Sequence, residues 1–288
     1  MLEIESMSSV RLDTLRRLHA EAFGGDWPSA EYSRNLYAAD SGGCFLALLD
    51  GEPVGYVCTH VNGSVGFLGP LGVLPHYRGR GYGGTLVQAG VDYLKARCDT
   101  VGPETTFGGP AIGLYSRLGF RETARAREMG KALPRNGVPQ ALGPTLRLGT
   151  DIVAKDAARV IAAVASWSAD VYQGIDFSGD LALFLSAYWE HVVFHFDGDA
   201  VDGFYAHCAE FRGEPWFAVR PLPQNETVLR ELVVGRIENS IYSLVDSFRP
   251  VASPARATPN RPRIGNPRIC TLAKSAKPCG GLICKPRP

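Results

Sequence analysis

Hydrophobic positions in the first half of the chain follow a helical period first and a strand period afterwards. Leucines at helical spacing predict a helix over residues 12–22, and residues 29–39 continue as a second helix. Apolar runs then predict three strands, at residues 44–49, 54–61 and 65–73. Asp50-Gly51 joins the first two strands and is typical of a tight hairpin turn. This half therefore predicts helices followed by an antiparallel sheet.

The helical period returns after the third strand. Residues 85–97 predict an amphipathic helix, and residues 111–118 predict another one that carries Tyr115. A short strand is expected near 105–107, and a last strand is expected over 121–132. The complete expected order is helix–helix–strand–strand–strand–helix–strand–helix–strand, which makes residues 1–133 one α/β domain of the α+β kind.

The second half of the chain resembles a weak repeat of the first. After a Pro- and Gly-containing linker at 134–144, helical spacing returns at 157–167 and a second amphipathic run covers 181–193. Residues 196–205 then echo the hairpin of residues 49–56, at an offset of 147 or 148 positions. The repeat and an unrelated α+β fold both remain open for a smaller second domain at 145–249.

Composition changes at residue 250. The segment 250–288 is rich in Pro, Lys and Arg and has no acidic residue, so it cannot bury enough apolar surface to fold alone. We expect a disordered basic tail. The alternatives are a tail that touches acidic partners and an end produced by a frameshift or read-through.

Overall charge and cysteine content narrow the class of protein. The 288 residues carry a formal net charge of +1, which gives no reason to expect binding to nucleic acid or to a membrane surface. The N-terminus lacks the pattern of a signal peptide, and no apolar run is long enough to span a membrane. Seven scattered cysteines without metal-ligand spacing predict reduced thiols in a cytoplasmic protein without a metal site.

The glycine-rich stretch that follows the third strand carries the candidate chemistry. A strand that leads through glycines into a helix N-terminus lets backbone N–H groups converge on a phosphate. Gly79, Gly81 and Gly84 also satisfy the dinucleotide pattern G-x-G-x-x-G. However, Pro75-His76-Tyr77-Arg78 separates the strand from the glycines, whereas a dinucleotide fold feeds them directly.

Two motifs resemble the signatures of the GCN5-related N-acetyltransferase (GNAT) family. The first reads Val-x-Pro-x-x-Arg-Gly-x-Gly-x-Gly from Val73 to Gly83, and the second ends with Tyr115 and Gly119-Phe120. The resemblance covers residues 1–133 and implies a mixed, mostly antiparallel sheet flanked by helices. One departure is Gly108, which stands where many members carry an Asn that touches the cofactor.

The resemblance implies acetyl-CoA as cosubstrate and assigns roles to individual residues. Leu71, Gly72 and Val73 would line the pantetheine arm, with a free strand N–H that polarises the thioester carbonyl. Tyr115 would be the general acid that protonates the departing thiolate. The pyrophosphate would bind the turn formed by Arg78, Gly79, Arg80, Gly81, Tyr82, Gly83 and Gly84.

The general base does not follow from the sequence. The third strand carries no Asp or Glu, and the candidates are Glu21, Asp26, Glu31, His60 and His76, or a chain of waters. Residues 69, 70 and 72, which are Gly, Pro and Gly, suit a bulge or an unpaired strand edge.

We therefore expect an acyl-CoA-dependent N-acyltransferase that acetylates an amine of a small molecule, peptide or protein by direct transfer in a ternary complex. The second domain could complete the acceptor pocket, mediate homodimerisation, or be a degenerate copy of the first. Two alternatives remain: a non-catalytic acyl-CoA-binding or regulatory module, and a dinucleotide-dependent oxidoreductase.

Overall fold

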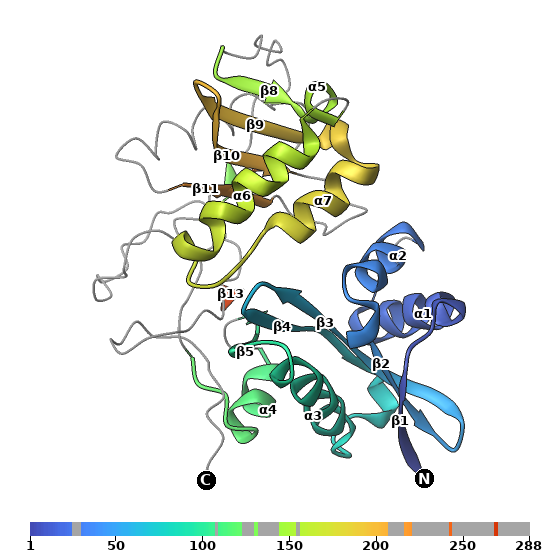
Figure 1. The fold of residues 1–288 in the computed structure, drawn as a ribbon. Coiled ribbons are helices and arrows are strands. Elements are labelled where there is room, and N and C mark those ends of the chain that lie inside the picture. The colour runs from blue at the N-terminus through green and yellow to red at the C-terminus, as the bar shows by residue number, and fades with distance from the viewer. Residues whose placement is uncertain are drawn as a thin grey trace.

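A five-stranded sheet forms the centre of the N-terminal half of this computed structural model (Figure 1). The strands lie in the order β1-β2-β3-β4-β5, and every pair is antiparallel except the parallel pair β4–β5. Their bounds are Leu2–Ser6, Phe45–Leu49, Glu52–Asn62, Val65–Val73 and Thr100–Pro103. The structure describes residues 1–24, 30–106, 109–122, 130–131, 144–153, 156–206, 216–220, 242–243 and 268–269.

Helices cover both faces of this sheet. α1 (Leu12–Phe23) and α2 (Ala30–Ala39) lie on one face, above a cluster that includes Leu15, Leu46 and Tyr56. The other face carries α3 (Tyr82–Lys95) and α4 (Ala111–Arg117). Leu86, Val91 and Tyr115 belong to the cluster between those helices and the sheet. The fold is thus the mixed, mostly antiparallel arrangement that the sequence predicted.

A second, four-stranded antiparallel sheet has the order β11-β10-β9-β8. Its strands are Leu146–Leu148 (β8), Val192–Asp197 (β9), Ala200–Ala206 (β10) and Trp216–Val219 (β11). A core of buried aliphatic and aromatic side chains joins β9 and β10 to α6 and α7. The helices of this half are α5 (Gly149–Val153), α6 (Ala157–Val171) and α7 (Ser178–Ala187), followed by the 3₁₀ turn Trp189–His191. This sheet with its helices is the smaller second α+β unit that the sequence predicted.

The two sheets share a detailed feature, the hairpin at their centre. In the first, Leu49 pairs with Glu52, and the register then shifts by one residue at Val54. In the second, Asp197 pairs with Ala200, and the register shifts at Asp202. Each of these positions lies 148 residues after its counterpart, so the two-residue turn and the β-bulge recur at one offset.

The seam between the two halves involves the end of β3 and the turn that follows it. Ser64 donates its backbone N–H to the carbonyl of Gly174, with an N···O distance of 3.0 Å. Asp180, in the first turn of α7, lies 2.6 Å from His60 Nε2 and accepts a 3.3 Å bond from Asn62. Because Asp180 is buried, these contacts hold the start of α7 against the tip of the β3–β4 hairpin.

Three sequence-based expectations are wrong in detail. Residues 2–6 form β1, an edge strand that was not predicted because only two apolar side chains alternate in it. Strand β5 was missed because its Gly and Pro hide its pattern, whereas the short strand expected near 105–107 is present as Thr105–Thr106 (β6). The run 181–193 is helical only to residue 187, because the β-branched pair at 192–193 begins β9.

Other expectations fall where the structure describes little. Residues 121–122 of the expected last strand are not a strand. Residues 123–129 and 132–143, which include most of the linker expected at 134–144, lie outside the described residues, as does the tail 250–288 apart from residues 268–269. Gly130–Lys131 (β7) pairs with Tyr242–Ser243 (β12), and β6 pairs with Arg268–Ile269 (β13).

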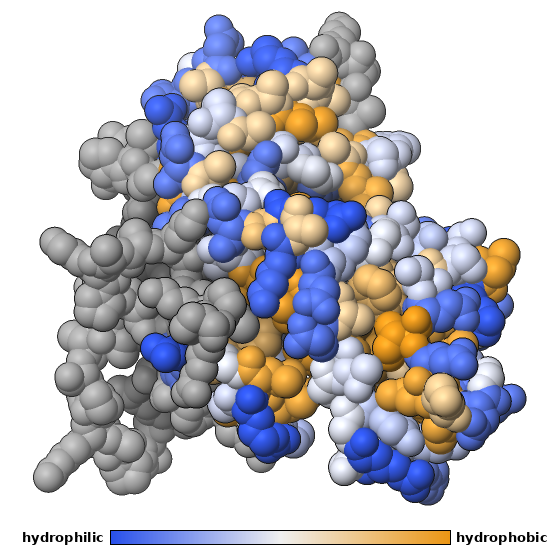
Figure 2. All heavy atoms as spheres, turned by 60° about the horizontal axis from the view of Figure 1, so that its bottom comes forward, coloured by the Kyte–Doolittle hydropathy of each residue, from blue (hydrophilic) through white to orange (hydrophobic). Residues whose placement is uncertain are grey.

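The surface mixes apolar and hydrophilic residues. Figure 2 shows a face on which apolar side chains lie in small groups between hydrophilic ones. Large hydrophobic side chains that are exposed in the described part of the chain include Val10, Phe23 and Trp189. Within that part, no helix combines the length and the apolar character needed to span a membrane.

Candidate functional site

Strand β4 separates from β5 halfway along its length. Its first four residues pair with β5, from Val65 with Thr100 to Leu68 with Pro103. Beyond Leu68, β4 stays paired with β3 but has no strand partner on its other side among the described residues. Backbone N–H groups within residues 71–73 can therefore face a ligand that enters between the two strands.

A bulge marks the point of separation. Leu68 pairs with Thr59 and Leu71 pairs with Val57, so Gly69 and Pro70 together oppose the single residue Cys58. A bulge bends its strand and interrupts the ladder. This confirms the irregularity that Gly and Pro predicted for this strand, and it places the bend directly before Leu71, Gly72 and Val73.

Gly72 is required by the packing on the α1 face of β4. A Cβ atom at this position would lie 2.5 Å from Cε1 of Tyr56 and 3.1 Å from Cβ of Ala22. Tyr56 is fully buried, and its hydroxyl lies 2.5 Å from Nδ1 of His19. Burial lowers the pKa of His19 to about 4, so its imidazole is neutral at physiological pH.

The glycine-rich turn leads into the N-terminus of α3. After the 3₁₀ turn Pro75–Tyr77, Gly79 and Gly81 have φ angles of +78° and +88°, and Gly81 is the N-cap of α3. Such angles favour glycine. A Cβ atom at Gly79, Gly81 or Gly84 would have no heavy atom within 4 Å, so the turn borders open space.

Electrostatics and hydrogen bonding both prepare this turn for an anion. Among the described residues, the backbone N–H groups from Gly79 to Gly83 donate to no backbone carbonyl. The first turn of the 14-residue helix α3 holds no acidic side chain. Unpaired N–H groups and the positive end of a helix dipole together favour phosphate.

The two arginines of the turn differ in their contacts. Arg78 donates from Nε to the carbonyl of Val73 at 3.0 Å and from Nη2 to the carbonyl of Ala22. Arg80 is exposed, and its guanidinium carbon lies 5.5 Å from the centre of the Tyr77 ring. Backbone carbonyls therefore fix the direction of the Arg78 side chain, whereas Arg80 contacts a ring and no carbonyl.

Tyr115 lies next to the turn, on α4. Its side chain is 3% exposed and packs edge-on against Phe120, with ring centres 5.6 Å apart. Leu114 approaches the position of a Gly83 Cβ to 3.5 Å, which places α4 beside the start of α3. Burial raises the pKa of Tyr115 to about 12, so the phenol stays protonated over the physiological range.

Candidate bases are mostly engaged elsewhere. Glu21 pairs with Arg17 at 3.3 Å, and His60 faces Asp180 at the seam. His76 is exposed, and Asp26 lies outside the described residues. Gly108, the departure from the family's Asn, also lies outside them. No group of three or more potential metal ligands occurs in the described part of the chain.

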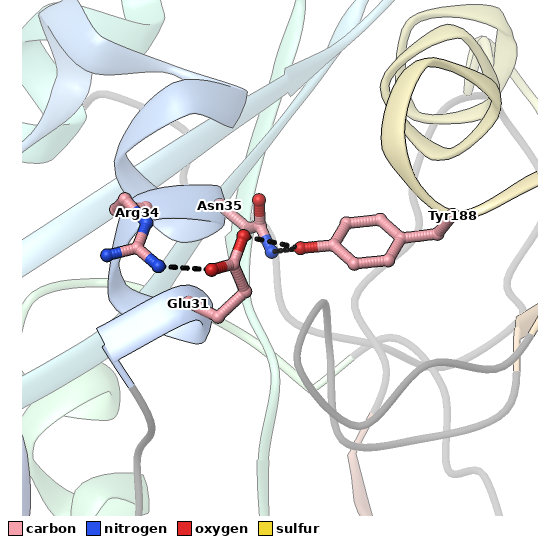
Figure 3. A network of polar contacts seen from close by, with 4 residues as sticks. All are labelled: Glu31, Arg34, Asn35 and Tyr188. Carbon is pink, nitrogen blue, oxygen red and sulfur yellow. Dashed lines mark hydrogen bonds and ion pairs between the residues drawn. The ribbon is translucent and has the colours of Figure 1, made fainter.

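A polar network at the seam was not predicted from the sequence (Figure 3). Tyr188, which follows α7, donates its hydroxyl to Glu31 Oε1 at 2.9 Å and accepts a bond from Asn35 Nδ2 at 2.6 Å. Glu31 also pairs with Arg34. Hydrogen bonds from Arg34 and Tyr188 lower the pKa of Glu31. The network ties α2 to the second half of the chain.

Comparison with known proteins agrees with this geometry. Residues 12–120 match the acetyltransferase (GNAT) family, a range that includes the glycine turn and Tyr115. An uncharacterized N-acetyltransferase of Archaeoglobus fulgidus is 30% identical over 111 residues, which are 33% of this chain and 76% of that protein. A mycothiol acetyltransferase of Acidothermus cellulolyticus is 33% identical over 129 residues, which cover 36% of this chain and only 39% of that relative.

A solved structure extends the likeness across both sheets. The structure of a putative acetyltransferase from Pyrococcus horikoshii superposes with a TM-score of 0.62 and covers 85% of this chain and 79% of that one. At 16% sequence identity, this likeness concerns the fold alone.

Proposed function

Because this chain belongs to the acetyltransferase (GNAT) family, we propose that it transfers an acyl group, most simply acetyl, from acyl-CoA to a primary amine. The observation that carries the proposal is the open glycine turn at the start of α3, beside the unpaired edge of β4. A turn of free N–H groups suits a pyrophosphate, and an unpaired strand edge suits the amide-containing pantetheine arm. The two features adjoin, so one extended cofactor can occupy both.

The cofactor enters this arrangement from the α3 side. In the proposal its pyrophosphate accepts hydrogen bonds from the backbone N–H groups of Gly79 to Gly83, with Arg80 adding charge. The pantetheine runs along Leu71, Gly72 and Val73. A strand N–H in this segment donates to the thioester carbonyl, where negative charge develops during transfer. The bulge at Gly69-Pro70 supports this role, since it bends the strand at the entrance.

The reaction needs one bond to form and one to break. The amine nitrogen attacks the thioester carbon, the N–C bond forms and the C–S bond breaks, while the amine gives its proton to water, from which the Tyr115 phenolate regains one after the transfer. Tyr115 donates a proton to the departing thiolate, since its raised pKa keeps the phenol protonated. Its burial beside α3 also excludes water from the thioester.

The acceptor amine approaches from the face that carries α1 and α2. The cofactor occupies the α3 side, and the strand edge between β4 and β5 opens the sheet to the opposite face. Glu31 on that side is already paired with Arg34 and Tyr188, so it leaves no uncompensated charge to select the amine. Small-molecule, peptide and protein amines all fit this description.

The second half of the chain is proposed to be a degenerate copy of the first, over 145–249, after a linker at 134–144. The hairpin turn and bulge that recur at an offset of 148 residues support duplication. Pro223 lies 148 residues after Pro75 but is not followed by the glycines of the turn, so we infer one acyl-CoA site per chain.

Ligand-induced stabilisation tests the cofactor assignment. We expect CoA and acetyl-CoA to raise Tm and NAD to leave it unchanged, because a ligand that binds only the native state stabilises it. Gly81→Ala should abolish the shift by filling the turn. Gly51→Ala is a matched control, because Gly51 also has a positive φ (+85°) and open space around its Cβ position.

A failure of both CoA species to shift Tm contradicts the proposal. Binding without thiol release, in an assay of acetyl-CoA with a panel of amines, would instead support the non-catalytic acyl-CoA-binding alternative. The oxidoreductase alternative predicts that NAD raises Tm. The first sheet does not favour this alternative, because it has one parallel strand pair, whereas dinucleotide-binding folds have a mostly parallel sheet.

A further inference from the structure

We propose that Arg78 is a positioning residue that couples the cofactor turn to the C-terminal end of α1, and that its side chain does not bind phosphate. The inference rests on the proposed function, because the ligand of the turn is taken to be CoA. It concerns a residue whose position in the glycine motif would by itself suggest a contact with the pyrophosphate.

The guanidinium of Arg78 is already committed to two backbone carbonyls. Nε donates to Val73, the last residue of β4, and Nη2 donates to Ala22, in the last turn of α1. A guanidinium has a fixed planar fork, so these two bonds set its direction. The charge also lies at the negative end of the α1 dipole, where a cation is stabilised.

α1 meets the site at a second point. Ala22 packs where a Cβ of Gly72 would be, 3.1 Å away, so the end of the helix rests directly on β4. The backbone of Arg78 opens the turn, and Gly79 with its positive φ follows it. Arg78 therefore links the two parts of the site: its backbone belongs to the glycine turn, and its side chain holds a carbonyl at the end of α1.

Arg80 provides the contrast. Both arginines are exposed, but Arg80, two residues further along the same turn, contacts the Tyr77 ring instead of a carbonyl. The contact with the Tyr77 ring is the interaction that the described part of the chain shows for its guanidinium. Arg80 is therefore the side chain that can add salt-sensitive attraction to a phosphate, since an exposed charge is screened by ions.

If Arg78 links the turn to α1, CoA binding should change the stability of the end of α1. When CoA orders the turn, Arg78 should restrain the last turn of α1, where Gly24 donates its N–H to Ala20 at 2.8 Å. The amides at this helix end should then exchange with solvent more slowly. Without the Arg78 fork, cofactor binding and the helix end become independent.

Hydrogen exchange with CoA as the probe tests the inference. In the wild type, saturating CoA should slow exchange in a peptide covering residues 12–24 severalfold. Arg78→Met should lose this protection while its CoA Kd rises less than about threefold, with unchanged salt dependence. Arg78→Lys, which keeps the charge but not the fork, should lose most of the protection too.

Arg80→Met is the matched control. It should weaken CoA binding at low salt, by about tenfold, and keep the protection of residues 12–24 at saturation. The inference is overturned if Arg78→Met loses affinity in a salt-dependent manner while α1 is still protected by CoA. If wild-type protein does not bind CoA, the proposed function fails, but unliganded Arg78→Met must still exchange faster at Gly24 than the wild type.

Discussion

Removal of one hydroxyl group should loosen the seam between the two halves of the chain. Tyr188→Phe deletes the oxygen that donates to Glu31 and accepts from Asn35, and it keeps the ring that packs against Phe184 at a centre distance of 6.0 Å. A neutral hydrogen bond contributes about 0.5–1.5 kcal/mol and one to a charged group about 1.5–3 kcal/mol. Because the Glu31 side chain is 41% exposed, we take the lower ends and expect a loss of about 2 kcal/mol.

Urea unfolding at pH 7 measures this loss, and two controls identify its origin. Tyr37→Phe changes a half-buried tyrosine of α2, the helix that carries Glu31 and Asn35, whose hydroxyl has no hydrogen-bond partner among the described residues; it should cost less than about 0.5 kcal/mol. A double-mutant cycle of Tyr188→Phe with Glu31→Gln should show a coupling of about 1 kcal/mol.

The pH dependence gives an independent check. Hydrogen bonds from Arg34 and Tyr188 lower the pKa of Glu31 below 4.5, so their stabilisation is present above that pH. It is lost as the pH falls through the lowered pKa, and the difference between wild type and Tyr188→Phe should shrink there. If Tyr188→Phe is as stable as Tyr37→Phe at pH 7, the reasoning is refuted.

Three further changes have defined outcomes. Gly72→Ala should lower the free energy of unfolding by about 1–3 kcal/mol, measured in urea, because its Cβ overlaps the Tyr56 ring; an unchanged value contradicts that packing. The neutral state of His19 stabilises the fold fully above its unfolded pKa of 6.5, so lowering the pH from 7 to 5 should cost about 1–2 kcal/mol, and His19→Gln should remove this dependence. Tyr115→Phe should reduce turnover by about 10²-fold or more with the CoA Kd unchanged, and the wild-type rate should show no Tyr115 titration below about pH 11, since its pKa is raised to about 12; retention of full turnover would remove Tyr115 from the mechanism.

Local patterns in the sequence predicted most of the first sheet because its elements carry strong short-range signals. The Asp50-Gly51 turn adopts positive φ at both residues, as the dipeptide indicates. The glycine turn at the start of α3 was equally visible, although the helix begins at Tyr82, three residues earlier than periodicity suggested. Strand β5 was missed because Gly102 and Pro103 are poor strand formers, and pairing with β4 overrides that preference.

The direction of side chains was beyond the reach of pattern. Nothing in the sequence says that Arg78 turns back to Ala22, 56 residues away, instead of facing the ligand. The hydrogen bond between Glu31 and Tyr188 spans 157 positions, and neither residue belongs to a motif that would single it out. Both contacts depend on how helices and strands pack against one another, and the spacing of residues along the chain does not determine that packing.

The recurring hairpin gives this chain an internal standard of comparison. Features that occur in both hairpins, such as the turns at Leu49–Glu52 and Asp197–Ala200, are the ones that the fold requires in each sheet. Features that occur in only one hairpin are specific to that half of the chain. Cys58 faces the bulge of β4, whereas its counterpart Ala206 pairs regularly with Trp216. The first sheet can thus be compared with the second, position by position, to separate what both sheets share from what is specific to the first.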